Sequence, residues 1–484
     1  MGREEQIVNE RLRKLKELKE LGINPYPAKF EKKQTVDECL NLKLGTSVKT
    51  AGRIMIKRGI GKIVFSNILD GTNKIQIVFQ DKETPEKTIE FFKKYLDVGD
   101  IIGVGGKIFK TKTGEISILV KKVDLLTKSI LPLPDKWHGL KDDEERLRKR
   151  YLDVIMNPEI RELVHKREIF WNSMRDFLKK RGFLEVETPV IENSAGGASA
   201  TPFKTYHNAL DIEVYLRISM GELWQKKLMV AGFEKTFEIG RQFRNEGMDI
   251  EHLQDYSQME FYWSYANYLD GMNLVEEMYK KVAKDVLGSL KFKTHGHSID
   301  LNKKWVSYDY EATIKKYTGI DIYKSDKKEL ELKLKELSVE YSPGDKWKLV
   351  DSLWKYCRKK ISGPGFLVGQ PVEVSPLAKR DVNDPRKVQQ FQVIIAGSEL
   401  GNGYSELNDP LDQEERFEKQ MELKNAGDSE AQDHDKAFVE ALKYGMPPTC
   451  GFGVSERFFS YLVDRPAREC QIFPLMKPES SEKK

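Results

Sequence analysis

The sequence predicts an α+β protein in which a small five-stranded barrel precedes a larger antiparallel sheet flanked by helices. Between residues 47 and 126, short segments of alternating apolar and polar residues are separated by Asp-Gly, Gly-Gly and Thr-Gly turns. Beyond residue 150, strands and helices follow one another without the regular strand–helix–strand rhythm of a parallel sheet. The length of 484 residues exceeds one ordinary domain and agrees with two.

Composition excludes several classes of protein. No apolar run approaches the roughly 18 residues that a membrane helix needs, and the N-terminus has no apolar signal segment. Four scattered cysteines without a Cys-x-x-Cys pair argue against a disulfide framework and against structural zinc. The net charge of +5 is too small to indicate nucleic-acid binding by itself. We therefore expect a cytoplasmic protein with no membrane association.

The N-terminal part begins with a helical pattern. Residues 5–21 place five apolar residues at helical spacing, and Gly22 with Pro25 ends the segment; the five are Val8, Leu12, Leu15, Leu18 and Leu21. A helix that docks on the protein and one that contacts RNA both fit this pattern. The strand-rich region that follows holds about five strands in under a hundred residues, for which an OB-fold is the simplest architecture.

The larger part mixes helices and strands. Asn157-Pro158 marks the start of a long helix that Gly182 ends. Strands are expected at 215–218, 235–246, 257–265 and 390–397, and helices at 269–287 and 411–424. The expected domain organisation is a helical extension (1–46), the barrel (47–130), a linker (131–150), the larger domain (151–478) with a helical insertion near 310–362, and a tail (479–484).

Three segments, 236–246, 257–265 and 401–407, each place polar side chains on one face. Alternation along a strand separates Met259, Phe261, Trp263 and Tyr265 from the polar residues between them. The three polar sets are Gln242, Arg244 and Glu246; Gln258, Glu260 and Tyr262; and Asn402, Tyr404 and Glu406. One such face alone would be a solvated surface, whereas three in one sheet predict a shared cleft. Its carboxylates suit a cationic substrate, and its arginine suits a carboxylate or a phosphate.

Several segments of the chain resemble a known enzyme family. RGFLEVETPVI, FEIGRQFRNEG and GFGVSERFF resemble motifs 1, 2 and 3 of the class II aminoacyl-tRNA synthetases, including Pro189 and Arg457. GGASATPFKTYHNALD, EVSPLAKR and ELGNGYSELNDPLDQEERFEKQ are similar to the lysyl-tRNA synthetases within that class. The resemblance extends from about residue 50 to Pro478. It implies an OB-fold anticodon-binding domain followed by a class II catalytic domain.

The resemblance implies activation of L-lysine by ATP, with Mg²⁺, and transfer of the lysyl group to the 3′ end of tRNA(Lys). It also implies a homodimer formed through the motif 1 region. The ATP-binding residues would be Arg244, Glu246, His252, Tyr256, Glu399 and Arg457; of these, Arg244, Arg457 and Glu399 would be catalytic, and Glu399 would bind the metal. The lysine-binding residues would be Gly197, Glu222, Glu260, Tyr262, Asn402, Tyr404 and Glu406.

The resemblance also assigns a role to the barrel. Arg58, Phe65, Gln76 and Glu115 would contact the tRNA anticodon, because an exposed aromatic ring can stack on an unpaired base while the polar groups read its edges. The alternative is that Phe65 belongs to the barrel core.

The chain departs from the family pattern at identifiable positions. Gln392 stands where a second metal-binding glutamate is usual, and an amide is a poorer Mg²⁺ ligand than a carboxylate. Glu456 stands where an aspartate is common in motif 3, and the segment around Glu222 is one residue longer than usual. Two alternatives remain: an aspartyl- or asparaginyl-type synthetase, and a non-catalytic RNA-binding paralogue.

Overall fold

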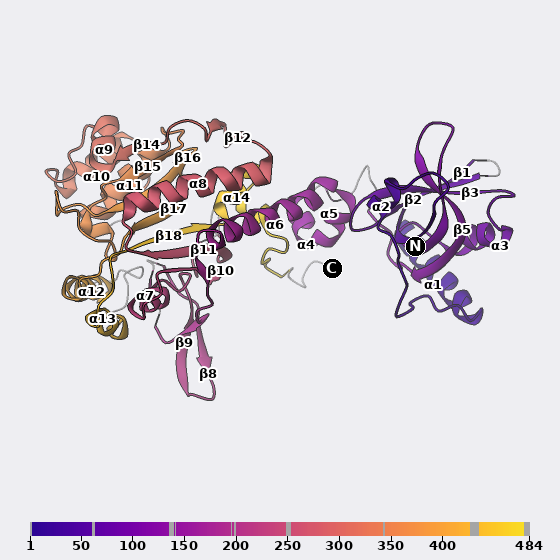
Figure 1. Cartoon of the computed structure of the whole chain (residues 1–484), viewed down its shortest axis with the longest axis horizontal. Coiled ribbons are helices and arrows are strands. Elements are labelled where there is room, and N and C mark those ends of the chain that lie inside the picture. Colours follow the sequence, from indigo (N-terminus) through magenta and orange to yellow (C-terminus); the bar gives the residue numbers. More distant parts are fainter. Residues whose placement is uncertain are drawn as a thin grey trace. The chain divides into compact units, whose positions relative to one another are not determined.

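The computed structural model describes residues 2–60, 63–134, 140, 142–194, 196–197, 200–247, 253–341, 344–425 and 435–478. The chain divides into two compact units, Met1–Glu145 and Arg146–Lys484. Figure 1 follows both units along the chain, from indigo at the N-terminus to yellow at the C-terminus. The expected tail at 479–484 lies outside the described residues.

The first unit is built on a closed five-stranded barrel with the strand order β1-β2-β3-β5-β4. Its strands are β1 (Ser47–Ile60), β2 (Ile63–Leu69), β3 (Lys74–Gln80), β4 (Ile101–Lys110) and β5 (Ile116–Thr127), with helix α3 (Glu86–Tyr95) between β3 and β4. Inward-facing side chains such as Ile54, Ile68 and Phe79 are fully buried, as alternation along the strands requires. The predicted five-stranded barrel is confirmed.

The N-terminal helix α1 (Arg3–Glu20) packs on the barrel through an unexpected residue. Of the predicted apolar face only Leu18 is fully buried, and Leu12 and Leu21 are 45% and 59% exposed. Arg11 is buried instead, and its guanidinium donates hydrogen bonds to the carbonyl oxygens of Val98 (2.7 Å) and Leu131 (2.8 Å). The predicted helix is present, and its buried contact is made by Leu18 together with an arginine whose hydrogen bonds are satisfied, instead of by all five apolar residues. A short helix, α2 (Val36–Leu40), leads into the barrel.

The second unit is built on an eight-stranded sheet with the order β14-β15-β16-β17-β18-β11-β10-β6. The strands are β6 (Leu184–Glu185), β10 (Lys235–Phe243), β11 (Asp255–Ser264), β14 (Val306–Asp309), β15 (Gly365–Val368), β16 (Gln390–Ile395), β17 (Ser398–Ser405) and β18 (Thr449–Ser455). Their pairings are antiparallel except for β6 with β10 and β14 with β15. The predicted antiparallel sheet is confirmed.

Helices cover one face of this sheet, as Figure 1 shows for α6 (Pro158–Lys179) and α8 (Tyr268–Leu287). Together with α14 (Arg457–Val463) they form the main apolar core, in which Phe170 and Tyr279 pack towards Phe261 and Phe452 of the sheet. Burial of these large rings stabilises the unit. The opposite face of the central strands lines the cavity described below.

The remaining elements surround the sheet. They are α4 (Asp143–Arg148), α5 (Arg150–Met156), β7 (Ile191–Glu192), β8 (Lys204–His207), β9 (Ile212–Leu216), α7 (Glu222–Val230), β12 (Lys291–Thr294), β13 (His297–Asp300), α9 (Tyr310–Thr318), α10 (Lys327–Glu336), α11 (Lys346–Arg358), the 3₁₀ turn η1 (Val372–Val374), α12 (Pro410–Asn425), α13 (Lys436–Lys443) and α15 (Ala467–Cys470). Among the described residues, no helix is both long and apolar enough to cross a membrane.

Strand ends differ from the sequence prediction in one informative place. Tyr265 was expected on the apolar face of β11, but β11 ends at Ser264 and Tyr265 has a φ of +62° and is 71% exposed. That prediction was wrong because the left-handed backbone breaks the two-residue alternation at this position.

Candidate functional site

A cavity of about 410 Å³ opens on the face of the sheet opposite α6 and α8. It is lined by residues of β11, β16, β17 and β18, by the segment that follows β10, and by the starts of α7 and α14. The lining includes all but one of the residues predicted for ATP and lysine binding, namely Gly197, Glu222, Arg244, Glu246, Tyr256, Glu260, Tyr262, Glu399, Asn402, Tyr404, Glu406 and Arg457. The remaining one, His252, lies outside the described residues. The three predicted polar sets therefore meet in one cavity, except for Gln242, which is buried and does not line it. The predicted strand at 235–246 ends early, at Phe243, and β17 ends at Ser405, so strand alternation does not account for the positions of Arg244, Glu246 and Glu406.

Two glycines of β18 form the floor of the cavity. Gly451 pairs with Tyr262 of β11 and Tyr404 of β17, so it lies between these two side chains. A Cβ at Gly451 would overlap Oε1 of Glu406, and a Cβ at Gly453 would lie 3.1 Å from Cγ of Glu260. Sequence reasoning missed both glycines, although a Gly-x-Gly pair inside a strand signals the close approach of another group.

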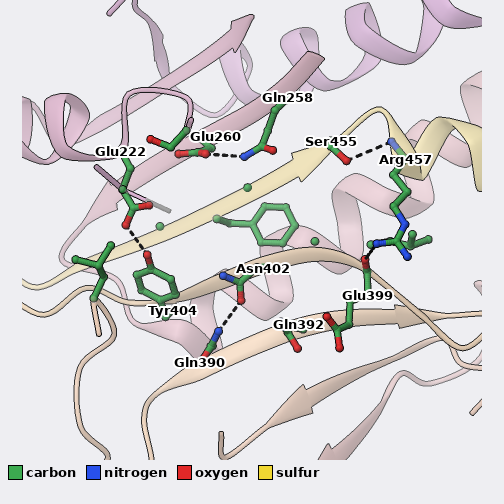
Figure 2. A pocket seen from close by; sticks show the side chains of 18 of the residues that line it. Glu222, Gln258, Glu260, Gln390, Gln392, Glu399, Asn402, Tyr404, Ser455 and Arg457 are labelled. Carbon is green, nitrogen blue, oxygen red and sulfur yellow. Dashed lines mark hydrogen bonds between the residues drawn. The ribbon is translucent and has the colours of Figure 1, made fainter. Parts of the chain in front are cut away.

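Three carboxylates gather at one end of the cavity. Glu260 and Glu222 lie there beside Tyr404, whereas Glu399 and Arg457 lie at the other end (Figure 2). Glu260 Oε1 accepts hydrogen bonds from Met220 N (3.1 Å) and Gln258 Nε2 (2.6 Å). Burial, with the nearby charge of Glu222, raises the pKa of Glu260 to about 7.

The other two carboxylates share a buried cation that the sequence reasoning missed. Lys226 Nζ lies 2.7 Å from Glu222 Oε1 and 2.6 Å from Glu406 Oε2. Tyr404 donates its hydroxyl hydrogen to the same oxygen of Glu222. Burial, only partly offset by Lys226, raises the pKa of Glu406 to about 8. The available sequence signal was the spacing of four residues between Glu222 and Lys226, which places both on one side of a helix.

Glu399, at the other end of the cavity, accepts a hydrogen bond from a residue of the helical insertion near 310–362. Trp354 of α11 donates from Nε1 to Glu399 Oε1 at 2.5 Å, and Gln392 of the adjacent β16 also lines the cavity. Within the described residues, no group of three or more His, Cys, Asp or Glu side chains could hold a metal ion. A Mg²⁺ ion that arrives with nucleotide phosphates needs only one or two protein oxygens, which Glu399 and Gln392 can supply.

Two arginines face the cavity from different elements. Arg244 follows β10, and its Nε donates to the carbonyl oxygen of Ile218 at 3.3 Å. Its guanidinium carbon lies 5.9 Å from the centre of the Tyr256 ring. Arg457 begins α14, and its Nη2 donates to Ser398 Oγ at 3.1 Å. Glu246 lies near the first of them and accepts a hydrogen bond from Thr201 N at 3.3 Å.

Glu456, which replaces the more common aspartate of motif 3, lines the cavity next to Arg457. It forms a buried ion pair with Arg167 of α6 and accepts a hydrogen bond from Gln471. Burial raises its pKa, and the charge of Arg167 opposes that shift. The carboxylate thereby anchors the start of α14 to α6, which leaves Arg457 directed into the cavity.

The four residues expected to contact RNA share the outer surface of the barrel. Arg58 of β1 is directly opposite Phe65 of β2, and Phe65 is opposite Val78 of β3. Gln76 lies two residues before Val78 and donates to Glu115 at 2.9 Å. Phe65 is half-buried between the inward-facing Val64 and Ser66, so it does not belong to the barrel core.

The comparisons with known protein families agree with this arrangement. Residues 142–477 match the family described as tRNA synthetases class II (D, K and N), and residues 48–126 match an OB-fold nucleic acid binding domain. A class II catalytic sheet preceded by an OB-fold barrel thus defines the class of protein as a class II tRNA synthetase.

The curated relatives identify the family within the class II tRNA synthetases. The chain is 43% identical to a lysine–tRNA ligase of Thermosipho africanus over 98% of this chain and 96% of the relative. It is 44% identical to that of Carboxydothermus hydrogenoformans over 98% of each chain, and 41% identical to that of Thermotoga maritima over 98% of this chain and 96% of the relative. The chain belongs to the lysine–tRNA ligase family.

Proposed function

We propose that the chain activates L-lysine with ATP and then transfers the lysyl group to the 3′ end of tRNA(Lys). The observation that supports the choice of amino acid is the group of three buried carboxylates, Glu222, Glu260 and Glu406, at one end of a cavity with Arg244 along its wall. Lysine carries two ammonium groups and one carboxylate, and charge-assisted hydrogen bonds favour this complementary arrangement.

Within this proposal each end of the cavity binds one substrate. Glu260 and the backbone at Gly197 take the α-ammonium group of lysine, while Glu222, Glu406 and Tyr262 take the ε-ammonium group. Asn402 and Tyr404 complete the wall of the lysine pocket. Glu246 accepts from the adenine amino group, Tyr256 stacks on the base, and His252 and Arg457 face the outer phosphates.

The reaction needs positioning and charge more than proton transfer. The carboxylate of lysine attacks the α-phosphorus of ATP, the bond to the β-phosphate oxygen breaks, and pyrophosphate leaves. Arg244 contacts both the attacking carboxylate and the α-phosphate, and Arg457 offsets the charge of the leaving group. When bound, Mg²⁺ would offset charge on the phosphate oxygens, held by Glu399 with Gln392 as a weaker neutral ligand.

Pyrophosphate exchange with each of the twenty amino acids, without tRNA, tests this assignment. Exchange with lysine alone is expected. Exchange with aspartate or asparagine would instead indicate the related synthetases of the same family, which must bind an anionic or amide side chain. Binding of tRNA without any exchange would favour a non-catalytic paralogue.

Lysine binding should weaken as the pH falls. The raised pKa values of Glu260 (about 7) and Glu406 (about 8) mean that the empty site holds protons that the ammonium groups must displace. Since only the ionised carboxylates bind ammonium, the KM for lysine should rise by roughly tenfold to a hundredfold between pH 8.5 and pH 6.5. Exchange kinetics across this range measure the change, with the KM for ATP as the control. A KM for lysine that stays constant would show that both carboxylates are already ionised at pH 6.5.

We assign Arg58, Phe65, Gln76 and Glu115 to the tRNA anticodon. Replacing Phe65 with alanine should lower kcat/KM for tRNA charging by about tenfold, because one stacked base contributes roughly 1–3 kcal/mol. Pyrophosphate exchange should stay unchanged, since it takes place in the other domain. Tyr26, an exposed ring elsewhere in the same unit, provides a matched Tyr26→Ala control. Loss of exchange together with charging would point to a misfolded protein.

We further propose the domain organisation set out from the sequence and a homodimer formed through the motif 1 region. Leu184, Val190 and Ile191 of that region are exposed in the single chain, which suits an apolar interface. Sedimentation of the active enzyme tests the assembly, and an active monomer would contradict it.

A further inference from the structure

Lys226 is a charged residue of the second unit that is buried. Its side chain is only 1% exposed, and its ammonium group lies between the carboxylates of Glu222 and Glu406. It is not among the residues that line the cavity, so it lies behind these carboxylates and not in the space they enclose. The rings of Tyr404 and Phe438 each lie 5.6 Å from its nitrogen.

Packing alone does not account for a lysine at this position. A buried ammonium group loses its hydration, and apolar residues of similar size fill such sites at lower cost. The neighbours Phe438 and Leu223 belong to an apolar cluster that would accept methionine. Burial lowers the pKa of Lys226, but the charges of Glu222 and Glu406 outweigh it and raise the pKa above its ordinary value. Lys226 is therefore a charged group at neutral pH.

The charged groups around Lys226 have an excess of negative charge. Among the described residues, the titratable groups that line this end of the cavity are Glu222, Glu260, Glu406, Tyr262 and Tyr404. Burial raises the pKa of both tyrosines well above the usual value, so they are neutral. Three carboxylates and one ammonium group give a net charge of −2 when all four are ionised. The two ammonium groups of a bound lysine would neutralise it, while Arg244 takes the carboxylate of the substrate.

The same contacts fix which oxygen atoms remain for a ligand. Lys226 takes Oε1 of Glu222 and Oε2 of Glu406, and Tyr404 also donates to Oε1 of Glu222. Oε1 of Glu406 lies over Gly451, where a Cβ would overlap it. The second oxygen of each carboxylate is thus left for a ligand ammonium group, and both carboxylates are held from behind.

We propose that Lys226 is a positioning residue that acts as a built-in counter-ion, offsetting part of the negative charge of Glu222 and Glu406 and holding both carboxylates in place for the second ammonium group of the substrate. The inference rests on the proposed function and deepens it, because it makes the preference for a dicationic amino acid depend on a residue that does not contact the substrate. Without Lys226 the three carboxylates, when ionised, would have a net charge of −3, and protons would compete more strongly with lysine for the pocket.

The test replaces Lys226 with methionine and with glutamine in the full-length protein and measures pyrophosphate exchange. Lys227→Met is the matched control, because Lys227 is the next residue of α7, lies over the Trp224 ring and does not line the cavity. Both Lys226 variants should raise the KM for lysine at least tenfold and change the KM for ATP less than twofold. The pH below which the KM for lysine rises should move upward by about one unit, since an uncompensated carboxylate binds its proton more tightly.

A structural role predicts a different outcome. If Lys226 only supports packing, Lys226→Met should shift the melting temperature and leave the KM for lysine and its pH dependence unchanged, which would overturn the proposal. Failure of both Lys226 variants to fold, while Lys227→Met folds, would also assign a structural role and overturn it. If the unmodified protein does not exchange with lysine, the proposed function itself fails, which distinguishes that result from failure of this inference.

Discussion

Replacing Glu406 with glutamine should raise the KM for lysine by about a hundredfold to a thousandfold. Glu406 is 2% exposed, so its carboxylate and the bound ammonium group form a pair that is shielded from water. Removing one partner of a buried ion pair costs roughly 3–5 kcal/mol because the other charge remains buried without compensation. Pyrophosphate exchange at varied lysine concentration measures the change, and the KM for ATP should stay within about twofold.

The Glu414→Gln variant is a suitable control for Glu406→Gln. Glu414 belongs to α12, pairs with Lys443 at the surface and does not line the cavity, so its replacement makes the same chemical change away from the site. Equal increases in the KM for lysine and the KM for ATP in Glu406→Gln would remove this residue from the ammonium site.

Replacing Arg244 with lysine should lower kcat for pyrophosphate exchange by roughly a hundredfold to ten-thousandfold. The proposed role needs one group that contacts two oxygen-rich partners at once, which a guanidinium does with its planar fork and an ammonium group does not. The hydrogen bond from Arg244 Nε to Ile218 O also orients that fork, and a lysine loses this support. Loss of such preorganised charge appears in kcat more than in KM.

The matched change for Arg244→Lys is Arg241→Lys. Arg241 lies on β10, three residues before Arg244, pairs with Asp255 at 3.1 Å and does not line the cavity, so exchange should stay close to that of the unmodified enzyme. A normal kcat in Arg244→Lys would show that positive charge alone suffices and that no bidentate contact is made.

Much of the candidate site follows from local pattern. Because side chains alternate along a strand, the sequence alone places Gln258, Glu260 and Tyr262 on one face and Met259 and Phe261 on the other, and the structure agrees. The same rule fails one step later at Tyr265, where the backbone adopts a positive φ that no periodicity encodes. The alternation of side chains therefore predicts the facing of residues inside a regular strand, and it does not apply beyond the last residue of that strand.

The sequence by itself determined the α+β class, the five-stranded barrel, the antiparallel sheet and most of the polar residues that meet in the cavity, because these depend on periodicity and motif order. Only the tertiary structure shows which residues from distant segments contact one another in the site. Lys226 reaches Glu406, and Gly451 makes room for the same carboxylate, although both lie far from it along the chain. Burial and charge from several segments together set the pKa of Glu406, so no local pattern contains that information.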